Sequence, residues 1–162
     1  MANGQAPRRR ALCLVPGLLC DAHVWAPQCA ALAGDCDVHI PELFAFRSIE
    51  DMAQHVLDEA PPHFALCGHS LGGRVALEII RRAPQRVERL ALLDTGTGPA
   101  RPVARAKRTA LVELARRKGM AALAAAWLPP MVHPDLPWDG AIMRGLRAMV
   151  GRMTPDIFEN QQ

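Results

Sequence analysis

The stretch that most constrains the fold is Phe64 to Arg82, FALCGHSLGGRVALEIIRR. The apolar run at its start, Phe64 to Cys67, predicts a buried strand, and Leu71 to Arg82 predicts a helix with one apolar face. The residues between them, GHSLG, have the pattern G-x-S-x-G in a strand-turn-helix context. This pattern is typical of a very tight turn that holds a serine hydroxyl clear of the backbone.

Ser70 is the nucleophile that this turn would present. Gly68 and Gly72 lie two positions before and after it, where a tight turn leaves no room for side chains, and Gly73 lets the helix press closely on the sheet. Because the helix begins directly after Ser70, the main-chain N–H of Leu71 is a natural donor to a developing oxyanion. A glycine-rich turn without catalysis is the alternative.

The segment GHSLGG after a hydrophobic strand resembles the α/β-hydrolase family. The resemblance implies an α/β fold with a parallel sheet, flanking helices and a helical cap. It also implies a serine hydrolase that acts on carboxylic esters or related acyl bonds through Ser70. Related members with this turn include methyl-ester carboxylesterases, cofactor-free haloperoxidases and carbon-carbon bond hydrolases, and the sequence does not separate them.

In the family, a glycine-containing loop after the first strand supplies a second oxyanion N–H. The segment PGLLCDAHVW follows the apolar run 11–15 and resembles that loop, although the family commonly has His-Gly where this chain has Pro16-Gly17. By position, this donor is the N–H of Leu18, with Leu19 as the alternative.

The pattern of the whole chain predicts about four parallel strands. Besides the strand before Ser70, apolar runs at 11–15, 37–40 and 87–93 alternate with helical segments. Ser48 is a good N-cap for the helix that follows it, and ligands are expected at the carboxyl ends of the strands.

Residues 1–7 are expected to form a disordered tail and residues 8–98 the hydrolase core. Beyond Arg101 the pattern changes to helices alone, over 103–118, 120–128 and 142–153. In the family an insertion at this place forms a cap over the active site, so residues 99–153 are predicted to be that cap. Its Met, Trp and Leu content would suit an apolar small-molecule substrate, but such residues are more often ordinary core.

Residues 154–162 predict the start of a helix, with Thr154 as N-cap and Pro155 in the first turn. Because the chain ends two turns later, we expect an interruption before the last strands of the family fold. Family order is serine, then acid, then histidine, and the segment that would carry the histidine lies beyond Gln162. The chain is therefore expected to be weakly active or inactive. The strand 87–93 would become an exposed apolar edge through which the chain associates with itself.

None of the six histidines is convincingly placed as the general base. His69 is expected to point away from the site, His23 and His133 are the only ones able to approach the serine, and a surface or core role is the better interpretation for all six. Asp94 follows the strand 87–93, where some family members place the acid of the triad. A turn in which its side chain bonds the backbone of Thr95-Gly96 is the favoured alternative.

Composition excludes several classes of function. The net charge is only +3, with arginines spread over expected helix surfaces and no tyrosine, so a nucleic-acid partner is not expected. The five cysteines show neither C-x-x-C pairs nor interleaved histidines, which predicts free thiols, no metal, no cofactor and a cytoplasmic location. No stretch is long and apolar enough to cross a membrane.

Two other functional classes remain open. The residues from Gly68 to Val75 resemble the phosphate-binding P-loop pattern G-x-x-x-x-G-K-[ST]. They differ from it at the last two positions, where Arg74 and Val75 replace the lysine and the Ser/Thr. A nucleotide binder is therefore a weaker alternative. A non-catalytic hydrolase fragment or pseudoenzyme is the stronger one.

Overall fold

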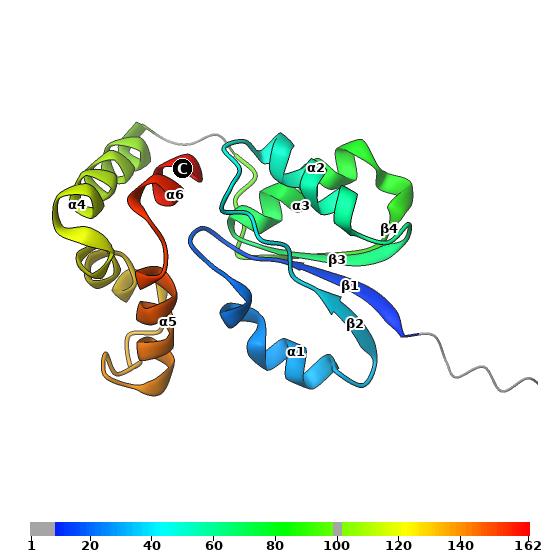
Figure 1. Ribbon diagram of the computed structural model, residues 1–162, viewed down its shortest axis with the longest axis horizontal. Helices are drawn as coiled ribbons and strands as arrows, with labels where there is room; N and C mark the ends of the chain where they lie inside the picture. Colours follow the sequence, from blue (N-terminus) through cyan, green and yellow to red (C-terminus); the bar gives the residue numbers. More distant parts are fainter. Residues whose placement is uncertain (1–8, 99–101) are drawn as a thin grey trace, which may run out of the picture.

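Four parallel strands form one sheet in the computed structural model, which describes residues 9–98 and 102–162 (Figure 1). Their order is β2-β1-β3-β4, with β1 at Arg10–Val15, β2 at Cys36–His39, β3 at Phe64–His69 and β4 at Val87–Leu93. The predicted α/β class and the parallel sheet of four strands are confirmed. The predicted disordered tail, residues 1–7, lies outside the described residues.

Helices cover both faces of this sheet (Figure 1). The helix α1, Ala26–Leu32, lies on one face, and α2, Ile49–Glu59, and α3, Leu71–Arg82, lie together on the other. The helix α2 begins as its sequence predicts, because the Ser48 side chain accepts a hydrogen bond from the N–H of Asp51. Three short 3₁₀ helices lie in the connections: η1 at Ala22–Trp25, η2 at Pro84–Arg86 and η3 at Pro129–Met131.

Alternate residues of the central strands are buried on opposite faces, as the pleat of a strand requires. In β1, Cys13 and Val15 pack in the core under α2 and α3, whereas Leu14 packs with Trp25 on the α1 side. The strand β3 is nearly continuously apolar for the same reason. A sheet covered on both faces therefore accounts for the uninterrupted apolar runs.

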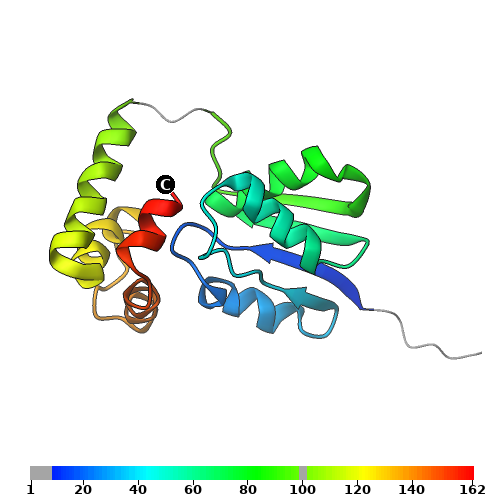
Figure 2. The ribbon, with the colours of Figure 1, turned by 45° about the horizontal axis from the view of Figure 1, so that its top comes forward.

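The second half of the chain forms a helical layer at one end of the sheet (Figures 1 and 2). It contains α4, Pro102–Trp127, α5, Ala141–Gly151, and α6, Pro155–Asn160. Gly119, at φ 81°, breaks α4 into two helices, which confirms the two helical segments expected there. Phe158 of α6 is fully buried against Trp127, with ring centroids 6.2 Å apart. No helix in the described part of the chain is long and apolar enough to span a membrane.

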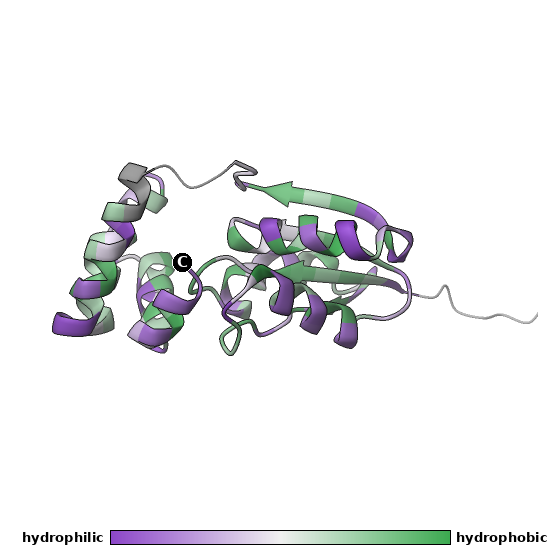
Figure 3. Cartoon of the chain, turned by 90° about the horizontal axis from the view of Figure 1, so that it is seen from above, coloured by the Kyte–Doolittle hydropathy of each residue, from purple (hydrophilic) through white to green (hydrophobic). Residues whose placement is uncertain are grey.

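The strand β4 is an edge of the sheet, and Figure 3 shows its apolar residues along that edge. Leu90, Leu92 and Leu93 are 42%, 38% and 43% exposed, respectively. The expected exposed apolar edge is confirmed, while self-association through it stays a prediction.

Candidate active site

Ser70 lies on a strained turn between β3 and α3. Its backbone has φ 53° and ψ −114°, a conformation that a non-glycine residue adopts only where its surroundings enforce it. Gly68 and Gly72 permit the turn, since a Cβ atom at Gly68 would clash with the Gly72 carbonyl, and one at Gly72 would clash with the Val15 carbonyl. The steric reason for both glycines in G-x-S-x-G is therefore close backbone packing.

The loop after β4 supports this turn from one side. The Ser70 N–H donates to the Leu93 carbonyl at 2.9 Å, and the Thr95 hydroxyl donates to the Ser70 carbonyl at 2.7 Å. The N–H of Gly73 donates to the same Ser70 carbonyl at 3.1 Å. Neighbouring segments thus fix the main chain on both sides of the nucleophile.

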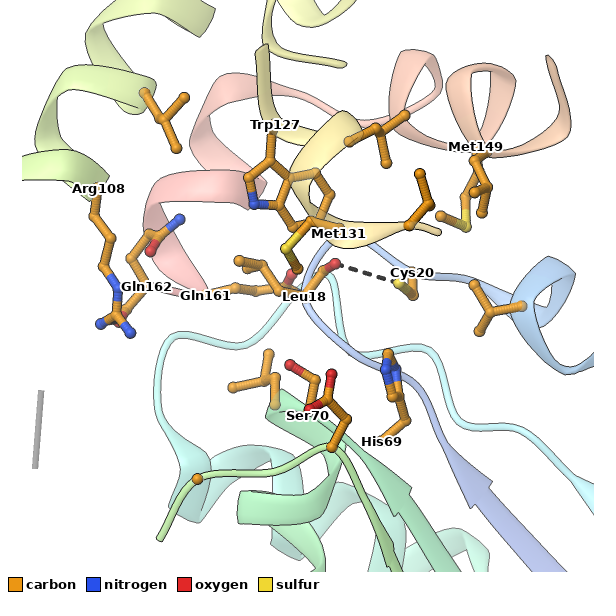
Figure 4. Close-up of a pocket in the computed structure, with 18 of the residues that line it drawn as sticks. Leu18, Cys20, His69, Ser70, Arg108, Trp127, Met131, Met149, Gln161 and Gln162 are labelled. Carbon is orange, nitrogen blue, oxygen red and sulfur yellow. Dashed lines mark hydrogen bonds between the residues drawn. The ribbon is translucent and has the colours of Figure 1, made fainter. Parts of the chain in front are cut away.

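A cavity of about 440 Å³ opens above Ser70, between the carboxyl ends of the strands and the helical layer (Figure 4). Ser70 and Leu71 lie at its floor and Leu18 lines it from the loop after β1, and all three were expected from the sequence as site residues. The helical layer contributes mainly apolar side chains: Leu111, Trp127, Leu128, Met131, Val132, Leu146 and Met149. The cavity can therefore take an apolar group while a carbonyl carbon lies beside the Ser70 hydroxyl.

The loop after β1 makes a tight turn over this floor. The Cys20 N–H donates to the Gly17 carbonyl at 3.1 Å, and Leu19 has φ 57°. The N–H of Leu19 donates to the side-chain oxygen Oε1 of Gln161 at 3.0 Å. The N–H of Leu18 makes no hydrogen bond to any described residue. Of the two candidate donors, Leu18 is thus the one left free.

Gln161 is a site residue that the sequence analysis missed. It follows α6, lines the cavity and is only 6% exposed (Figure 4). Its side-chain nitrogen Nε2 donates to the Leu43 carbonyl at 3.4 Å. The available signal was its position three residues after the buried Phe158, on the same face of the helix, where a polar side chain needs partners.

The six histidines all lie within the described residues, and only His69 lines the cavity with Ser70. The expectation that His69 points away from the site is wrong. Its ring packs against Gly17 and makes a T-shaped contact with Trp25, with ring centroids 6.4 Å apart. His23 packs instead against Gly145 of α5, and the side chain of His133 is 76% exposed.

Asp94 also lines the cavity, with a backbone φ of 45°. Its carboxylate makes no hydrogen bond to the described residues, so neither a histidine nor the backbone of Thr95-Gly96 orients it. Arg74, which stands at the lysine position of a P-loop, donates instead to the carbonyls of Gly96 and Gly98, both at 3.1 Å. These bonds weaken the nucleotide-binding alternative.

Two charged or polarisable groups border the loop after β1. Burial raises the pKa of the Cys20 thiol to about 12, so the thiol stays protonated, and its Sγ donates to the Leu18 carbonyl at 3.4 Å. Burial tends to raise the pKa of Asp21. This effect is outweighed by hydrogen bonds from Arg152 and from the His23 N–H, together with the positive charge of Arg152, so the pKa of Asp21 is lowered. Within residues 9–98 and 102–162, no group of His, Cys, Asp and Glu side chains is arranged to hold a metal ion.

The sequence matches known hydrolases over part of their length. It is 37% identical over 96 residues to a pimeloyl-[acyl-carrier protein] methyl ester esterase of Klebsiella pneumoniae subsp. pneumoniae, covering 54% of this chain and 37% of that protein. A protein of the same name from Nitrosospira multiformis is 46% identical over 46 residues, which cover 28% of this chain and 18% of that protein. The matches thus span less than two fifths of these relatives.

Two solved structures share the fold. The enol-lactonase from Burkholderia xenovorans has a TM-score of 0.79 at 24% identity, covering 98% of this chain and 65% of that one. A carboxylesterase of Nitrososphaera gargenis has a TM-score of 0.76 at 19% identity, covering 93% and 61%. The sequence model that describes the alpha/beta hydrolase family matches residues 10–159, which is nearly the whole chain. The chain therefore belongs to the alpha/beta hydrolase family.

Proposed function

We propose that this chain cleaves carboxylic esters or related acyl bonds through nucleophilic attack by Ser70. The observation that carries the proposal is the strained turn that presents Ser70 at the floor of an apolar cavity. The Ser70 oxygen would attack the carbonyl carbon, the alcohol would leave, and water would then release the acyl group from the serine.

The main-chain N–H groups of Leu18 and Leu71 are the proposed oxyanion donors. Leu71 begins α3, and the N–H groups of a first helical turn have no acceptor within their own helix. The N–H of Leu18 is unpaired among the described residues, whereas that of Leu19 is engaged by Gln161. One such donor contributes about 10² to 10³ to the rate of acyl transfer in characterised enzymes.

The proton of Ser70 has no well-placed acceptor among the six histidines. The ring of His69 lies in the cavity but packs against Gly17 and Trp25, and Asp94, the candidate acid, has no histidine to orient. We therefore expect slow acylation. A serine site without its complete triad retains roughly a 10³-fold acceleration over water from oxyanion stabilisation and binding.

The proposed substrate is a small ester with an apolar acyl or alcohol group, which the Trp127 and Met131 side of the cavity would contact. The names of the matched relatives, methyl ester esterases, support an ester bond as the target. In this proposal residues 8–98 are the catalytic core and residues 99–153 are the cap that contacts the substrate. We also propose a cytoplasmic location, supported by five cysteines that form no disulfide.

Covalent labelling by a fluorophosphonate probe tests this function. The chain contains only two serines, Ser48 and Ser70, so mass spectrometry assigns the modified site without ambiguity. We expect slow labelling of Ser70, none of Ser48, and none in the Ser70→Ala variant. Absence of labelling in protein that melts cooperatively would instead support the alternative, a non-catalytic member of the family. Protection of the fold by ATP would support the nucleotide-binding alternative.

A further inference from the structure

The side chain of Gln161 connects the last helix to the loop that carries the proposed oxyanion donor. We propose that Gln161 is a positioning residue, which holds the turn Gly17–Cys20 in the conformation that aims the Leu18 N–H at the substrate. This inference rests on the proposed function, because it assigns a role within the same site. In this role Gln161 acts through the loop and not on the reacting atoms.

Burial and hydrogen bonding both single out this side chain. Among the described residues, Gln161 is the only polar or charged residue that is buried. Both ends of its amide have partners, since Oε1 accepts from the Leu19 N–H at 3.0 Å and Nε2 donates to the Leu43 carbonyl at 3.4 Å. A buried amide with both ends engaged fixes the geometry of the groups it joins. The Gln161 side chain thus connects the loop after β1, through Leu19, to the segment after β2, through Leu43.

The conformation of the turn shows what this bond holds. The Cys20 N–H donates to the Gly17 carbonyl, Leu18 does not have positive φ, and Leu19 has φ 57°. These features describe a type II turn, which normally has glycine at the position of Leu19. The type I alternative differs by rotation of the peptide between Leu18 and Leu19, and it would return Leu19 to negative φ. Some contact must therefore hold that peptide in the less favourable orientation.

The peptide between Leu18 and Leu19 is held at both of its polar atoms. Its N–H donates to Gln161 Oε1, and its carbonyl accepts from Cys20 Sγ at 3.4 Å (Figure 4). The bond to Gln161 is the stronger of the two, because a thiol is a weak donor. Rotation of this peptide would point a carbonyl at Oε1 and leave two oxygens facing each other. Gln161 therefore favours the type II turn.

The consequence for catalysis follows from the position of Leu18. Its Cα joins the clamped peptide to the peptide that carries the proposed oxyanion donor, so a change in one alters the direction of the other. Oxyanion donors act only when they are aimed within a few tenths of an ångström of the developing charge. Loss of the clamp should therefore lower the rate of the chemical step and leave binding in the apolar cavity largely unchanged.

The variant Gln161→Met tests this role, because methionine keeps the length of the side chain and removes both hydrogen bonds. Gln28→Met is the matched control, since Gln28 is exposed on α1. Two measurements are made on the 162-residue chains at a temperature where each is fully folded: hydrogen exchange at the Leu19 amide by NMR, and the kinetics of Ser70 labelling by a fluorophosphonate.

We expect exchange at Leu19 to be about tenfold faster in Gln161→Met, as loss of one buried hydrogen bond implies. The maximal labelling rate should fall about tenfold or more, with the half-saturating concentration of the fluorophosphonate unchanged. Gln28→Met should match the parent in both measurements. Unchanged exchange, or faster exchange with unchanged maximal labelling, would overturn the proposal. A fall in labelling explained wholly by weaker half-saturation would also overturn it.

The two measurements separate this proposal from the proposed function. If the parent chain does not react with the fluorophosphonate, the proposed hydrolase function is contradicted. The clamp is then judged by exchange at Leu19 together with the amide chemical shift of Leu18. A Leu18 shift that is the same in Gln161→Met and in the parent would overturn the positioning role without any reference to activity.

Discussion

The hydroxyl of Thr95 donates a 2.7 Å hydrogen bond to the main-chain carbonyl of Ser70. The same side chain fills the space beside Gly73, where an added Cβ atom would lie 2.6 Å from it. The loop after β4 therefore packs directly against the turn that carries the nucleophile, although β4 is an edge strand. Support of the turn depends on that edge remaining in place.

Replacing Thr95 by valine should reduce the free energy of unfolding by about 1 kcal/mol, the usual effect of losing one such hydrogen bond. The Ser70 carbonyl would still accept from the Gly73 N–H. Thr95→Ser keeps the hydroxyl and is the control. Urea denaturation measures both, and equal stability of the two variants would show that the hydrogen bond contributes nothing.

Gly72→Ala should destabilise the fold by about 3 kcal/mol or prevent folding, because the new methyl group would overlap the carbonyls of Val15 and Pro16 in β1 and its loop. Gly34→Ala is the control, since a Cβ there meets nothing within 4 Å and should change stability by less than about 0.5 kcal/mol. Thermal unfolding followed by circular dichroism compares the two. A Gly72→Ala chain as stable as Gly34→Ala would contradict the packing described for the turn.

Gly119→Ala should lower the free energy of unfolding by about 1 to 3 kcal/mol, although nothing lies within 4 Å of the position that its Cβ would occupy. The cost is conformational, since Gly119 has φ 81° at the break in α4. Gly151→Ala in α5 also meets open space but has no positive φ, so helix propensity should make it neutral or stabilising by up to about 1 kcal/mol. Urea denaturation should show a lower free energy of unfolding for Gly119→Ala and an equal or higher one for Gly151→Ala. A similar loss of stability in both variants would contradict this explanation.

The ion pair between Asp21 and Arg152, at 2.6 Å, should make stability depend on acid pH. The pKa of Asp21 is lower in the folded chain than its ordinary value of 3.8. Its contribution is therefore present above that value and is lost as the pH falls through the folded pKa. At pH 7 the Asp21→Asn variant should be less stable by at most about 1 kcal/mol, because Arg152 is half-exposed and the pair is screened.

Asparagine can still accept from the His23 N–H, so Asp21→Asn keeps the cap of the short helix η1. The difference in unfolding free energy between parent and variant should shrink below pH 4 and in 1 M salt. A difference that stayed constant from pH 7 to pH 3 would show that the ion pair is not its cause.

The apolar edge of β4 should cause association at high concentration, since the free backbone groups of an edge strand can pair with another chain. Leu92→Lys should reduce this association, because a charge on the edge opposes pairing. Ile142→Lys is the control, as Ile142 is 63% exposed on α5, away from the edge. Light scattering across a concentration series measures both. A parent that stays monomeric throughout would contradict the prediction.

The sequence by itself determined the local structure of the site. Strand, turn and helix around Ser70 follow from an apolar run, two obligatory glycines and helical spacing, which are interactions among neighbouring residues. The helix caps at Ser48 and Thr154 were likewise predictable, because each hydroxyl bonds an N–H three residues ahead. The exposed edge at β4 followed from the family resemblance carried by the same turn.

Only the tertiary structure decided which distant groups meet at the cavity. Gln161 and Leu19 are 142 positions apart, and nothing in either neighbourhood indicates that an amide from the last helix would hold the loop after the first strand. The direction of His69 was predicted wrongly for the same reason, since Gly17 and Trp25, from another loop, fix its ring. Local sequence sets the backbone through short-range sterics and hydrogen bonds, whereas the direction of a buried side chain is set by the segments that pack around it.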